Sequence, residues 1–218
     1  MKDKLKIGLL GLGRIGKLHA ANVQNAIPDA EITLAADPFL NEEMELFAKG
    51  IGIPRCTKNT EEIFSDPEID AVFICSSTDT HADFIVKAAE AGKQIFCEKP
   101  IHTDISKIKE ALSAVEKAGV RLQLGFVRRF DKSHKKVRDI VASGRLGKPC
   151  VIKVCSRDPE APPMSYVEVS GGIFLDMMIH DFDMARYLAG SDIEEVSTFG
   201  ACLINPDFSK YKDVDTAV

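Results

Sequence analysis

Residues 5–16 read LKIGLLGLGRIG, and this stretch sets the expected architecture. The apolar run from Leu5 to Leu10 is typical of a buried strand. It leads directly into GLGRIG at 11–16, a G-x-G-x-x-G motif at a strand-to-helix junction. In such a loop the first glycine permits a tight turn, the second lets a pyrophosphate approach the backbone, and the third lets the helix pack close to the sheet. The stretch therefore predicts the phosphate-binding loop of a dinucleotide-binding domain.

Asp37 supports this interpretation. It ends the second apolar run, Ile32 to Ala36, 21 residues after Gly16. There a carboxylate can accept hydrogen bonds from both hydroxyls of an adenosine ribose. Asp37 would repel a 2′-phosphate, and the next two residues, Pro-Phe, supply no guanidinium to bind one. We therefore expect NAD rather than NADP. The alternative is a glycine-rich turn without function.

From residue 5 to about 126, short aliphatic runs alternate with segments of helical periodicity, which predicts βαβ units on a parallel sheet. The runs expected to be strands are Leu5 to Leu10, Ile32 to Ala36, Ala71 to Ser76, Gln94 to Cys97 and Val120 to Phe126. A helix is expected from Ile105, with Thr103 as its N-cap and Gly119 as its stop. We therefore predict an α/β fold, with a doubly wound Rossmann domain over residues 1–126.

The pattern changes after Phe126, and a partial α+β substrate domain is expected over residues 127–218. Its expected elements are a helix ending near Gly144, a strand from Cys150 to Arg157, a Pro-rich loop at 159–163, a long helix from Ile173 to Ala189 and a strand from Val196 to Leu203. The basic stretch from Arg128 to Arg138 is expected to be a solvated helix face. Because the last residues, DVDTAV, look like the start of another strand, we expect a truncated chain.

The composition of the 218-residue chain is that of a soluble globular protein, with 45% hydrophobic and 28% charged residues. The net charge of −5 argues against nucleic acid or an anionic membrane as the main partner. The six cysteines form no C-x-x-C pair, and four lie in apolar runs, so we expect reduced thiols and a cytoplasmic protein. No stretch approaches the ~18 apolar residues of a membrane span.

Candidate binding residues follow two further strands at the carboxyl edge of the sheet. The segment SSTDTH at 76–81 offers hydroxyl groups and backbone amides, although Thr78 or Thr80 could simply cap the next helix. Glu98-Lys99-Pro100 places a lysine at the same edge, where the alternative is a solvated side chain. The residues predicted to bind the cofactor are Gly11, Gly13, Arg14, Ile15, Gly16, Asp37, Ser76, Ser77, Thr78, His81, Glu98 and Lys99.

The candidate reacting groups lie on the expected long helix, which is apolar in nearly every direction. Asp176, His180 and Asp183 stand at i, i+4 and i+7, within an arc of roughly 60° on a regular helix. Asp176 can orient the His180 imidazole and raise its proton affinity, so that His180 takes a proton from an alcohol near neutral pH. A nearby ammonium such as Lys99 would stabilise the developing alkoxide charge.

Other interpretations of this helix stay open. The pair could be a satisfied Asp–His pair in the core. A metal site is disfavoured, because two ligands at i and i+4 need a third that the sequence does not supply nearby, and we expect no metal. The remaining histidines, expected to have packing or solvated roles, are His19, His81, His102 and His134.

The motifs together resemble the Gfo/Idh/MocA family of glucose-fructose oxidoreductases and inositol dehydrogenases. The matching segments are GLGRIG, the strand-end Asp37, SSTDTH, EKP, GFVRRF at 125–130 and GGIFLDMMIHDFDMARYL at 171–188. The triplet EKP followed far downstream by D-x-x-x-H is more specific than the glycine loop. The resemblance implies that Lys99, Asp176 and His180 form a catalytic set that works with NAD.

Within the family, these segments are most similar to the inositol 2-dehydrogenases, which oxidise myo-inositol to its 2-keto product, scyllo-inosose. The residues that the resemblance implies for substrate binding are Lys99, Arg129, Asp176, His180 and Asp183. It also implies a homo-oligomer in the full-length form. The chain ends where the family continues its second sheet and builds its usual oligomer face. Two alternatives stay open. One is a dehydrogenase for a related sugar or cyclitol, and the other is an NAD-binding module without turnover.

Overall fold

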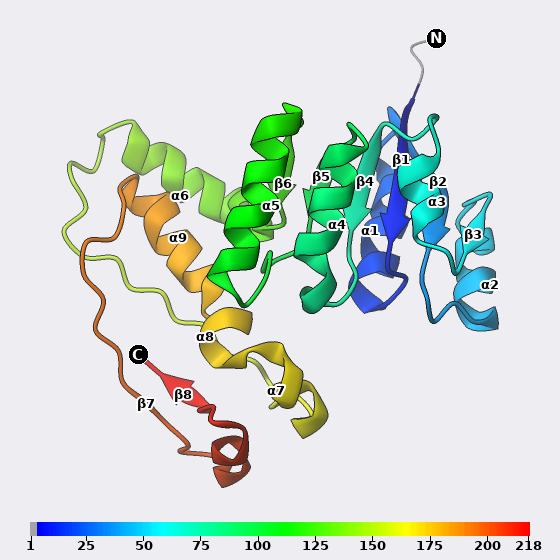
Figure 1. The fold of residues 1–218 in the computed structure, drawn as a ribbon. Coiled ribbons are helices and arrows are strands. Elements are labelled where there is room, and N and C mark those ends of the chain that lie inside the picture. Colours follow the sequence, from blue (N-terminus) through cyan, green and yellow to red (C-terminus); the bar gives the residue numbers. More distant parts are fainter. Residues whose placement is uncertain (1–3) are drawn as a thin grey trace. The chain divides into compact units, whose positions relative to one another are not determined.

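The computed structural model describes residues 4–218 and contains two compact units, the first ending at Gly125 and the second covering Phe126–Val218. In the first unit, six parallel strands form one sheet in the order β3-β2-β1-β4-β5-β6 (Figure 1). The strands are β1 Leu5–Leu10, β2 Ala30–Ala36, β3 Cys56–Thr57, β4 Ala71–Ile74, β5 Gln94–Cys97 and β6 Leu122–Leu124. The strand order reverses between β1 and β4, which confirms the predicted doubly wound sheet.

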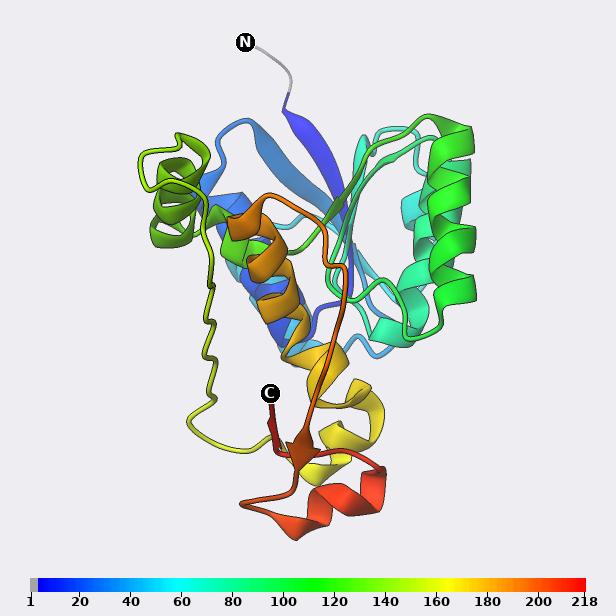
Figure 2. The same ribbon diagram turned by 90° about the vertical axis from the view of Figure 1, so that its left-hand side faces the viewer.

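Helices cover both faces of this sheet (Figures 1 and 2). They are α1 Arg14–Ala26, α2 Glu42–Gly50, α3 Glu61–Ser65, α4 Thr78–Glu90 and α5 Ile105–Ala118. One buried cluster joins α1 and α2 to the sheet through residues such as Ala20, Val23 and Ala48. A second joins α3, α4 and α5 through Ile63, Ile85 and others. The burial of both sheet faces explains why the strand sequences are nearly continuous apolar runs.

The structure corrects three details of the first unit. The N-cap of α5 is Asp104, whose side chain accepts a hydrogen bond from the Ser106 N–H, and not Thr103. Gly119 does end this helix, in the left-handed conformation at φ 66°. The strand β3 was not expected, because it has only two residues. It pairs with the end of β2. The predicted strand Val120 to Phe126 is shortened to β6.

The second unit consists mainly of helices and extended segments. Its elements are η1 Val127–Phe130, α6 Lys132–Ala142, α7 Met164–Ser170, α8 Gly172–Asp176, α9 Ile179–Ala189, β7 Gly200–Ala201, η2 Pro206–Tyr211 and β8 Thr216–Ala217. The strands β7 and β8 pair antiparallel as a two-stranded sheet. The unit therefore combines helices with a small antiparallel sheet.

The strand predicted from Cys150 to Arg157 is wrong, because this segment is extended but forms no ladder within residues 4–218. The strand predicted from Val196 to Leu203 is likewise reduced to β7. A strand pattern in sequence becomes a strand only where a neighbour supplies backbone partners. Side chains of both segments lie at the surface, with Val151 87% and Phe199 77% exposed.

The long helix predicted from Ile173 to Ala189 is also wrong, because it is broken between α8 and α9. At the joint the Met178 N–H donates to the carbonyl of Ile173, five residues back, and the His180 N–H donates to Met177, three residues back. These bonds replace the regular i to i−4 ladder and change the direction of the chain. Nor is the segment buried all round, since Leu175 is 37% and Phe182 39% exposed.

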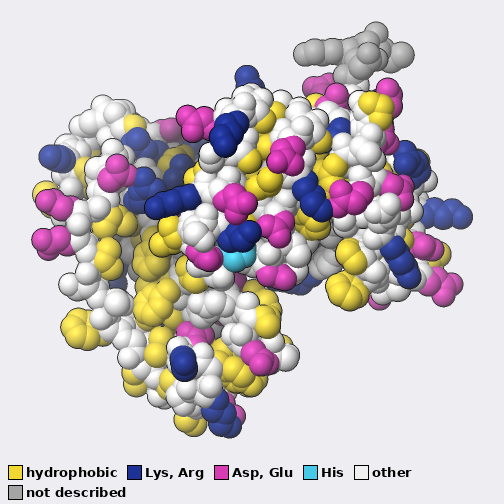
Figure 3. Space-filling view, viewed as in Figure 1, with side chains coloured by type: hydrophobic (Ala, Val, Ile, Leu, Met, Phe, Trp, Pro, Cys, Tyr) yellow, Lys and Arg dark blue, Asp and Glu magenta, His cyan; other side chains and the backbone are white. Residues whose placement is uncertain are grey.

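The surface shows how the two units differ. Figure 3 shows acidic and basic side chains interspersed over the helices of the first unit, and hydrophobic side chains at the surface of the second unit around α8. None of the helices within residues 4–218 is long and apolar enough to cross a membrane.

Candidate active site

The glycine loop between β1 and α1 has the geometry that the motif predicts. Gly11 lies at φ +93°, and a Cβ there would stand 2.6 Å from the carbonyl oxygen of Cys75. At Gly16 a Cβ would stand 2.0 Å from the carbonyl oxygen of Gly11. The closest neighbour of Gly16 is therefore the loop itself, and the sheet side, through Cys75, comes next at 3.6 Å. Both glycines are required by backbone that lies against them.

Gly13 has a different surrounding, because nothing lies within 4 Å of the position that its Cβ would take. Gly13 is the N-cap of α1 and provides no side-chain acceptor for the first amide groups of this 13-residue helix. Open space in front of unsatisfied N–H groups at a helix N-terminus fits a phosphate. The loop therefore fits the pyrophosphate of a dinucleotide, in which Arg14 and Ile15 supply the next backbone amides.

Asp37 is 7% exposed and joins the second strand to the glycine loop. Its Oδ2 accepts a hydrogen bond from the Leu12 N–H at 2.8 Å, and its Oδ1 accepts one from the Phe39 N–H at 2.8 Å. Each carboxylate oxygen has more than one acceptor site, so two ribose hydroxyls can still bind. The same carboxylate thus holds the loop, and its contact with the ribose stays a prediction.

The segment after β4 is ordered by its own hydroxyl groups. The N-cap of α4 is Ser77, and no side chain of the segment caps the helix, so the capping alternative for Thr78 and Thr80 is wrong. The Thr80 hydroxyl instead donates to the Ser77 carbonyl at 2.7 Å and lies 2.6 Å from the Ser76 hydroxyl. These bonds fix the backbone at the strand end.

His81 is buried, at 2% exposed, and both its ring nitrogens face carbonyl oxygens. Nδ1 lies 2.8 Å from the oxygen of Pro100, and Nε2 lies 3.0 Å from that of Ser76. His81 thus joins the ends of β4 and β5. Its role in cofactor binding stays a prediction, and it would act through the main chain of those two segments.

Glu98 and Lys99 follow β5, and the Lys99–Pro100 peptide bond is cis. Nε2 of His19, from α1, lies 2.6 Å from Oε1 of Glu98. The Lys99 N–H donates to Oε2 of Glu98 at 3.3 Å. Burial alone would raise the pKa of Glu98, but the hydrogen bond and charge of His19, with the Lys99 N–H, outweigh it and lower the pKa.

His19, which was expected to have a packing or solvated role, lies beside the candidate residue Glu98. It stands three residues after Gly16 and one before the buried Ala20, so the periodicity of α1 already turned it toward the sheet. That spacing was the available signal. Its partner could not be read from the pattern, because Glu98 is 79 positions away along the chain.

In the second unit, the structure joins two candidates, Arg129 and Asp183. The guanidinium donates to both carboxylate oxygens, with Nε 2.8 Å from Oδ2 and Nη2 2.5 Å from Oδ1. These hydrogen bonds raise the pKa of Arg129. Asp183 is 7% exposed, so its first partner is Arg129, and its contact with a substrate hydroxyl stays a prediction.

A second pair of this kind was missed, because Arg128 and Arg129 were expected to belong to a solvated face. Nη1 of Arg128 lies 2.6 Å from Oδ1 of Asp181, and the Ser156 hydroxyl donates to the same oxygen at 2.5 Å. The sequence carried no signal for this pairing, because the two residues are 53 positions apart. Only α6, which has no buried residue, fits the expected solvated face.

Asp176 and His180 lie on different helices, α8 and α9, and the arc calculated for one regular helix does not describe them. Asp176 accepts a hydrogen bond from the Tyr166 hydroxyl at 2.9 Å. His180 lies in the first turn of α9 and is half-buried. Asp183, one turn further, faces Arg129. Lys99 belongs to the first unit, whereas Asp176 and His180 belong to the second.

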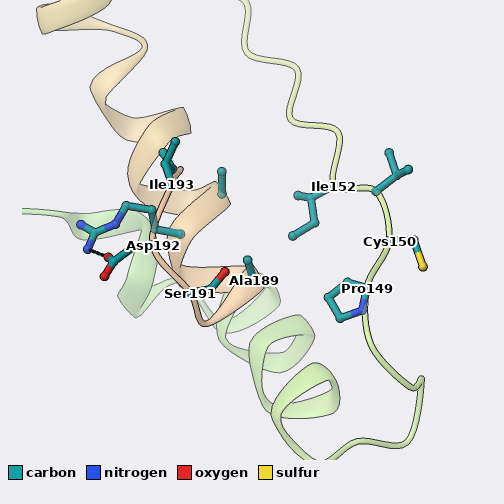
Figure 4. A pocket seen from close by; sticks show the side chains of 10 residues that line it. Pro149, Cys150, Ile152, Ala189, Ser191, Asp192 and Ile193 are labelled. Atoms are coloured by element: carbon teal, nitrogen blue, oxygen red, sulfur yellow. Dashed lines mark hydrogen bonds and ion pairs between the residues drawn. The ribbon is translucent and has the colours of Figure 1, made fainter. Parts of the chain in front are cut away.

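Further features of the second unit lie outside these candidates. Within residues 4–218, no group of three or more His, Cys, Asp or Glu side chains is arranged to hold a metal ion. A pocket of about 250 Å³ lies between the extended segment at 149–152 and the end of α9 (Figure 4). Pro149 and Ile152 point toward the helix there, and Cys150 points away. The pocket contains none of the predicted site residues.

The contribution of the Arg129–Asp183 pair to the free energy of unfolding can be compared with that of an exposed ion pair. We expect Asp183→Asn to lower the free energy of unfolding by about 1–3 kcal/mol, because a buried charged hydrogen bond is weakened. Asp139→Asn, which removes the exposed ion pair with Lys135 on α6, is expected to cost less than about 0.5 kcal/mol. Urea unfolding followed by circular dichroism measures both. Equal effects would contradict the assignment.

Comparisons with known proteins agree with this architecture. Residues 5–126 match the family model described as an oxidoreductase family with an NAD-binding Rossmann fold, and residues 134–218 match the model of the Gfo/Idh/MocA C-terminal domain. An uncharacterized oxidoreductase of Bacillus subtilis is 48% identical over 218 residues, which are 100% of this chain and 63% of that protein. The myo-inositol 2-dehydrogenase of Thermotoga maritima is 44% identical over 98% of this chain and 64% of that protein.

A solved structure has a similar fold over nearly the whole chain. The scyllo-inositol dehydrogenase of Lactobacillus casei, with bound cofactor NAD(H) and scyllo-inositol, has a TM-score of 0.89 at 34% identity and is matched over 99% of this chain and 65% of that one. The chain thus spans less than two thirds of the length of these relatives. With a glycine loop and an acidic strand end that fit NAD, and with both family models matched, the chain belongs to the Gfo/Idh/MocA oxidoreductase family.

Proposed function

We propose that the protein is an NAD-dependent dehydrogenase that oxidises a secondary alcohol of a cyclic polyol, and that its substrate is myo-inositol, which becomes the 2-keto product. The observation that carries the proposal is the fit of the first unit to NAD, together with a strand-end lysine and a helix-borne aspartate and histidine in the order that the family uses. The names of two relatives, a myo-inositol and a scyllo-inositol dehydrogenase, support the class of substrate.

The roles of the residues follow from the chemistry of the alcohol. His180 takes the hydroxyl proton as general base, and Asp176 orients His180 and shares the proton. Lys99 stabilises the charge that develops on the oxygen. NAD, when bound, would supply the acceptor for the hydride of the carbinol carbon. Arg129 and Asp183 hold further hydroxyls of the ring, or hold each other and shape the position of α9.

The NAD of this proposal is held by the glycine loop and Asp37. The backbone amides of residues 13–16 bind the pyrophosphate, and Asp37 accepts from the adenosine ribose. Ser76, Ser77 and Thr78 line the same edge of the sheet, and Glu98 acts beside Lys99. We also propose a cytoplasmic location and a homo-oligomer in the full-length form, with neither nucleic acid nor membrane as partner.

The test is to add NAD and myo-inositol and to follow the absorbance of the reduced cofactor. We expect reduction with NAD and much less with NADP. The second candidate substrate is another polyol, and the scyllo-inositol dehydrogenase among the similar structures favours it. Rates measured with a panel of cyclitols and sugars distinguish it from myo-inositol. A third candidate is NAD binding without turnover. Since the chain contains no Trp, fluorescence of the reduced cofactor reports binding directly, and binding without reduction for any polyol would overturn the enzymatic proposal.

A further inference from the structure

We propose that His19 and Glu98 form a positioning pair that holds the Lys99 main chain at a fixed place relative to the phosphate-binding helix α1. The inference rests on the proposed function in one respect, since it takes Lys99 as the group that touches the reacting oxygen. Neither His19 nor Glu98 needs to contact substrate in this role. They act on Lys99 and on the glycine loop through the backbone that each one anchors.

The pair connects two parts of the first unit that are far apart in sequence. His19 lies on α1, which begins at Arg14 within the glycine motif. Glu98 directly follows β5 and precedes Lys99. The 2.6 Å contact between the two side chains is therefore a link from the helix that faces the pyrophosphate to the segment that carries the lysine.

The surroundings of the pair are built to hold it in one geometry. The side chains of His19 and Glu98 are 17% and 15% exposed. The imidazole meets the ring of Phe96 edge-on at 5.0 Å and that of Phe73 at 6.4 Å. On the other side, a Cβ at Gly125 would lie 3.1 Å from the Glu98 carboxyl group, so the glycine leaves room for the carboxylate. A surface pair has none of these constraints.

The ionisation of Glu98 fixes the direction of the hydrogen bond. Its pKa is lowered from 4.5 despite burial, so the carboxylate is ionised at neutral pH and can only accept. The His19 Nε2 must then carry a proton and donate it. The groups that face Glu98 are His19 from α1, Lys99 from its own segment, and the thiols of Cys75 and Cys97. Burial raises the pKa of both thiols, so they stay neutral.

The second oxygen of the Glu98 carboxylate is engaged as well. Oε2 accepts the Lys99 N–H, while Oε1 is held by His19, so one carboxylate fixes the helix and the lysine backbone together. A charged, buried hydrogen bond with both oxygens engaged defines geometry better than a solvated one. Loss of either partner is therefore expected to displace the Lys99 backbone and the N-terminal end of α1 together.

The same helix provides a matched control. Lys17 of α1 contacts Glu43 of α2 at the same distance, 2.6 Å, but the Glu43 side chain is 81% exposed. Glu43→Gln removes a charge pair of equal length on the same helix, without touching the Lys99 segment. Effects that appear in Glu98→Gln and His19→Ala but not in Glu43→Gln belong to the buried pair.

The experiment uses His19→Ala, His19→Gln, Glu98→Gln and Glu43→Gln in the whole 218-residue chain. We expect His19→Ala and Glu98→Gln to raise the Kd for NADH roughly tenfold and to lower kcat by a similar factor, since a charged hydrogen bond is lost. His19→Gln, whose amide nitrogen can reach the place of Nε2, is expected to restore most of both. Reductive methylation with ¹³C-formaldehyde, with Lys99→Arg for assignment, is expected to show a displaced Lys99 signal in His19→Ala.

The outcomes separate three explanations. If His19→Ala changes only the unfolding midpoint, while NADH binding, kcat and the Lys99 signal of the folded variant match the parent protein, the pair is structural and the inference is wrong. If no polyol supports the reduction of NAD by the parent protein, the proposed function fails. The NADH titration and the Lys99 signal then still test the positioning role. If Glu43→Gln gives the same changes, the effect does not belong to this pair.

The pair also predicts a pH dependence of stability. Because the pKa of Glu98 is lower in the folded protein than its ordinary 4.5, its ionisation stabilises the fold fully above that value. This stabilisation is lost as the pH falls through the lowered pKa. The unfolding midpoint of the parent protein should therefore exceed that of Glu98→Gln by a constant amount above about pH 5, and the difference should shrink in acid. A difference that grows in acid would contradict the assignment.

Discussion

Replacement of His180 by alanine is expected to lower kcat for NAD reduction by roughly 10²–10⁴-fold, the usual contribution of a general base. In the proposed reaction the hydride leaves the carbinol carbon while the hydroxyl proton must also depart, and His180 is the group that takes it. NADH binding is expected to stay the same, since His180 lies on α9 of the second unit and the glycine loop belongs to the first. Steady-state kinetics with myo-inositol and a fluorescence titration with NADH measure the two effects separately.

His134→Ala is the control for this experiment. His134 lies in the same unit, on α6, and its exposed ring contacts Asp131 at 3.1 Å. Its removal is expected to leave kcat within about twofold, because an exposed pair contributes little. If His180→Ala retains the full rate, the assignment of the general base is wrong. If it also abolishes NADH binding, its role is not confined to proton transfer.

Gly16→Ala is expected to weaken NADH binding at least about a hundredfold, which corresponds to roughly 3 kcal/mol, and to destabilise the first unit. The added Cβ would stand 2.0 Å from the Gly11 carbonyl oxygen and 2.9 Å from its carbonyl carbon. Both are backbone atoms of the phosphate-binding loop, so the loop must move away from the helix. Overpacking of this kind costs about 1–3 kcal/mol of stability.

Two other glycines show whether this effect is specific. Gly13→Ala meets no atom within 4 Å, so we expect unchanged stability but weaker NADH binding, because the methyl group occupies the space proposed for the pyrophosphate. Gly50→Ala, at the end of α2 and equally open, is expected to change neither beyond about 0.5 kcal/mol. Thermal unfolding and NADH titration of the three variants form one experiment. Tight binding in Gly16→Ala would refute the loop geometry described above.

The first unit was predictable because its signals are local. The strand β1, the glycine loop, α1, β2 and Asp37 follow one another within residues 5–37, and each is specified by its own periodicity or turn chemistry. The two-residue β3 carries too little pattern to be recognised. The N-cap of α5 was misplaced by one residue, because Thr103 and Asp104 both have side chains suited to the position.

The second unit was predicted less well, for a physical reason. An uninterrupted apolar pattern without Pro suggests one helix, yet the backbone changes its hydrogen bonding at Met177 and Met178, where tertiary packing overrides local preference. The pairs of Arg128 with Asp181 and of Arg129 with Asp183 join positions 53 and 54 residues apart. Such contacts are set by the fold, and single-sequence periodicity contains no information about them. The extended segment at 150–157 had a strand pattern but no neighbour.

The double engagement of Asp37 bears on attempts to redesign this NAD-binding domain for NADP. The usual exchange of the strand-end acid for a small neutral residue removes the repulsion of a 2′-phosphate, but here it would also leave the buried Leu12 amide without its acceptor. Such a variant would recognise the new coenzyme with a loosened loop, and its gain in selectivity would be offset by weaker binding overall. A successful exchange has to install a replacement acceptor for Leu12 together with a cationic side chain near Phe39, so the coenzyme switch in this scaffold is a two-site problem.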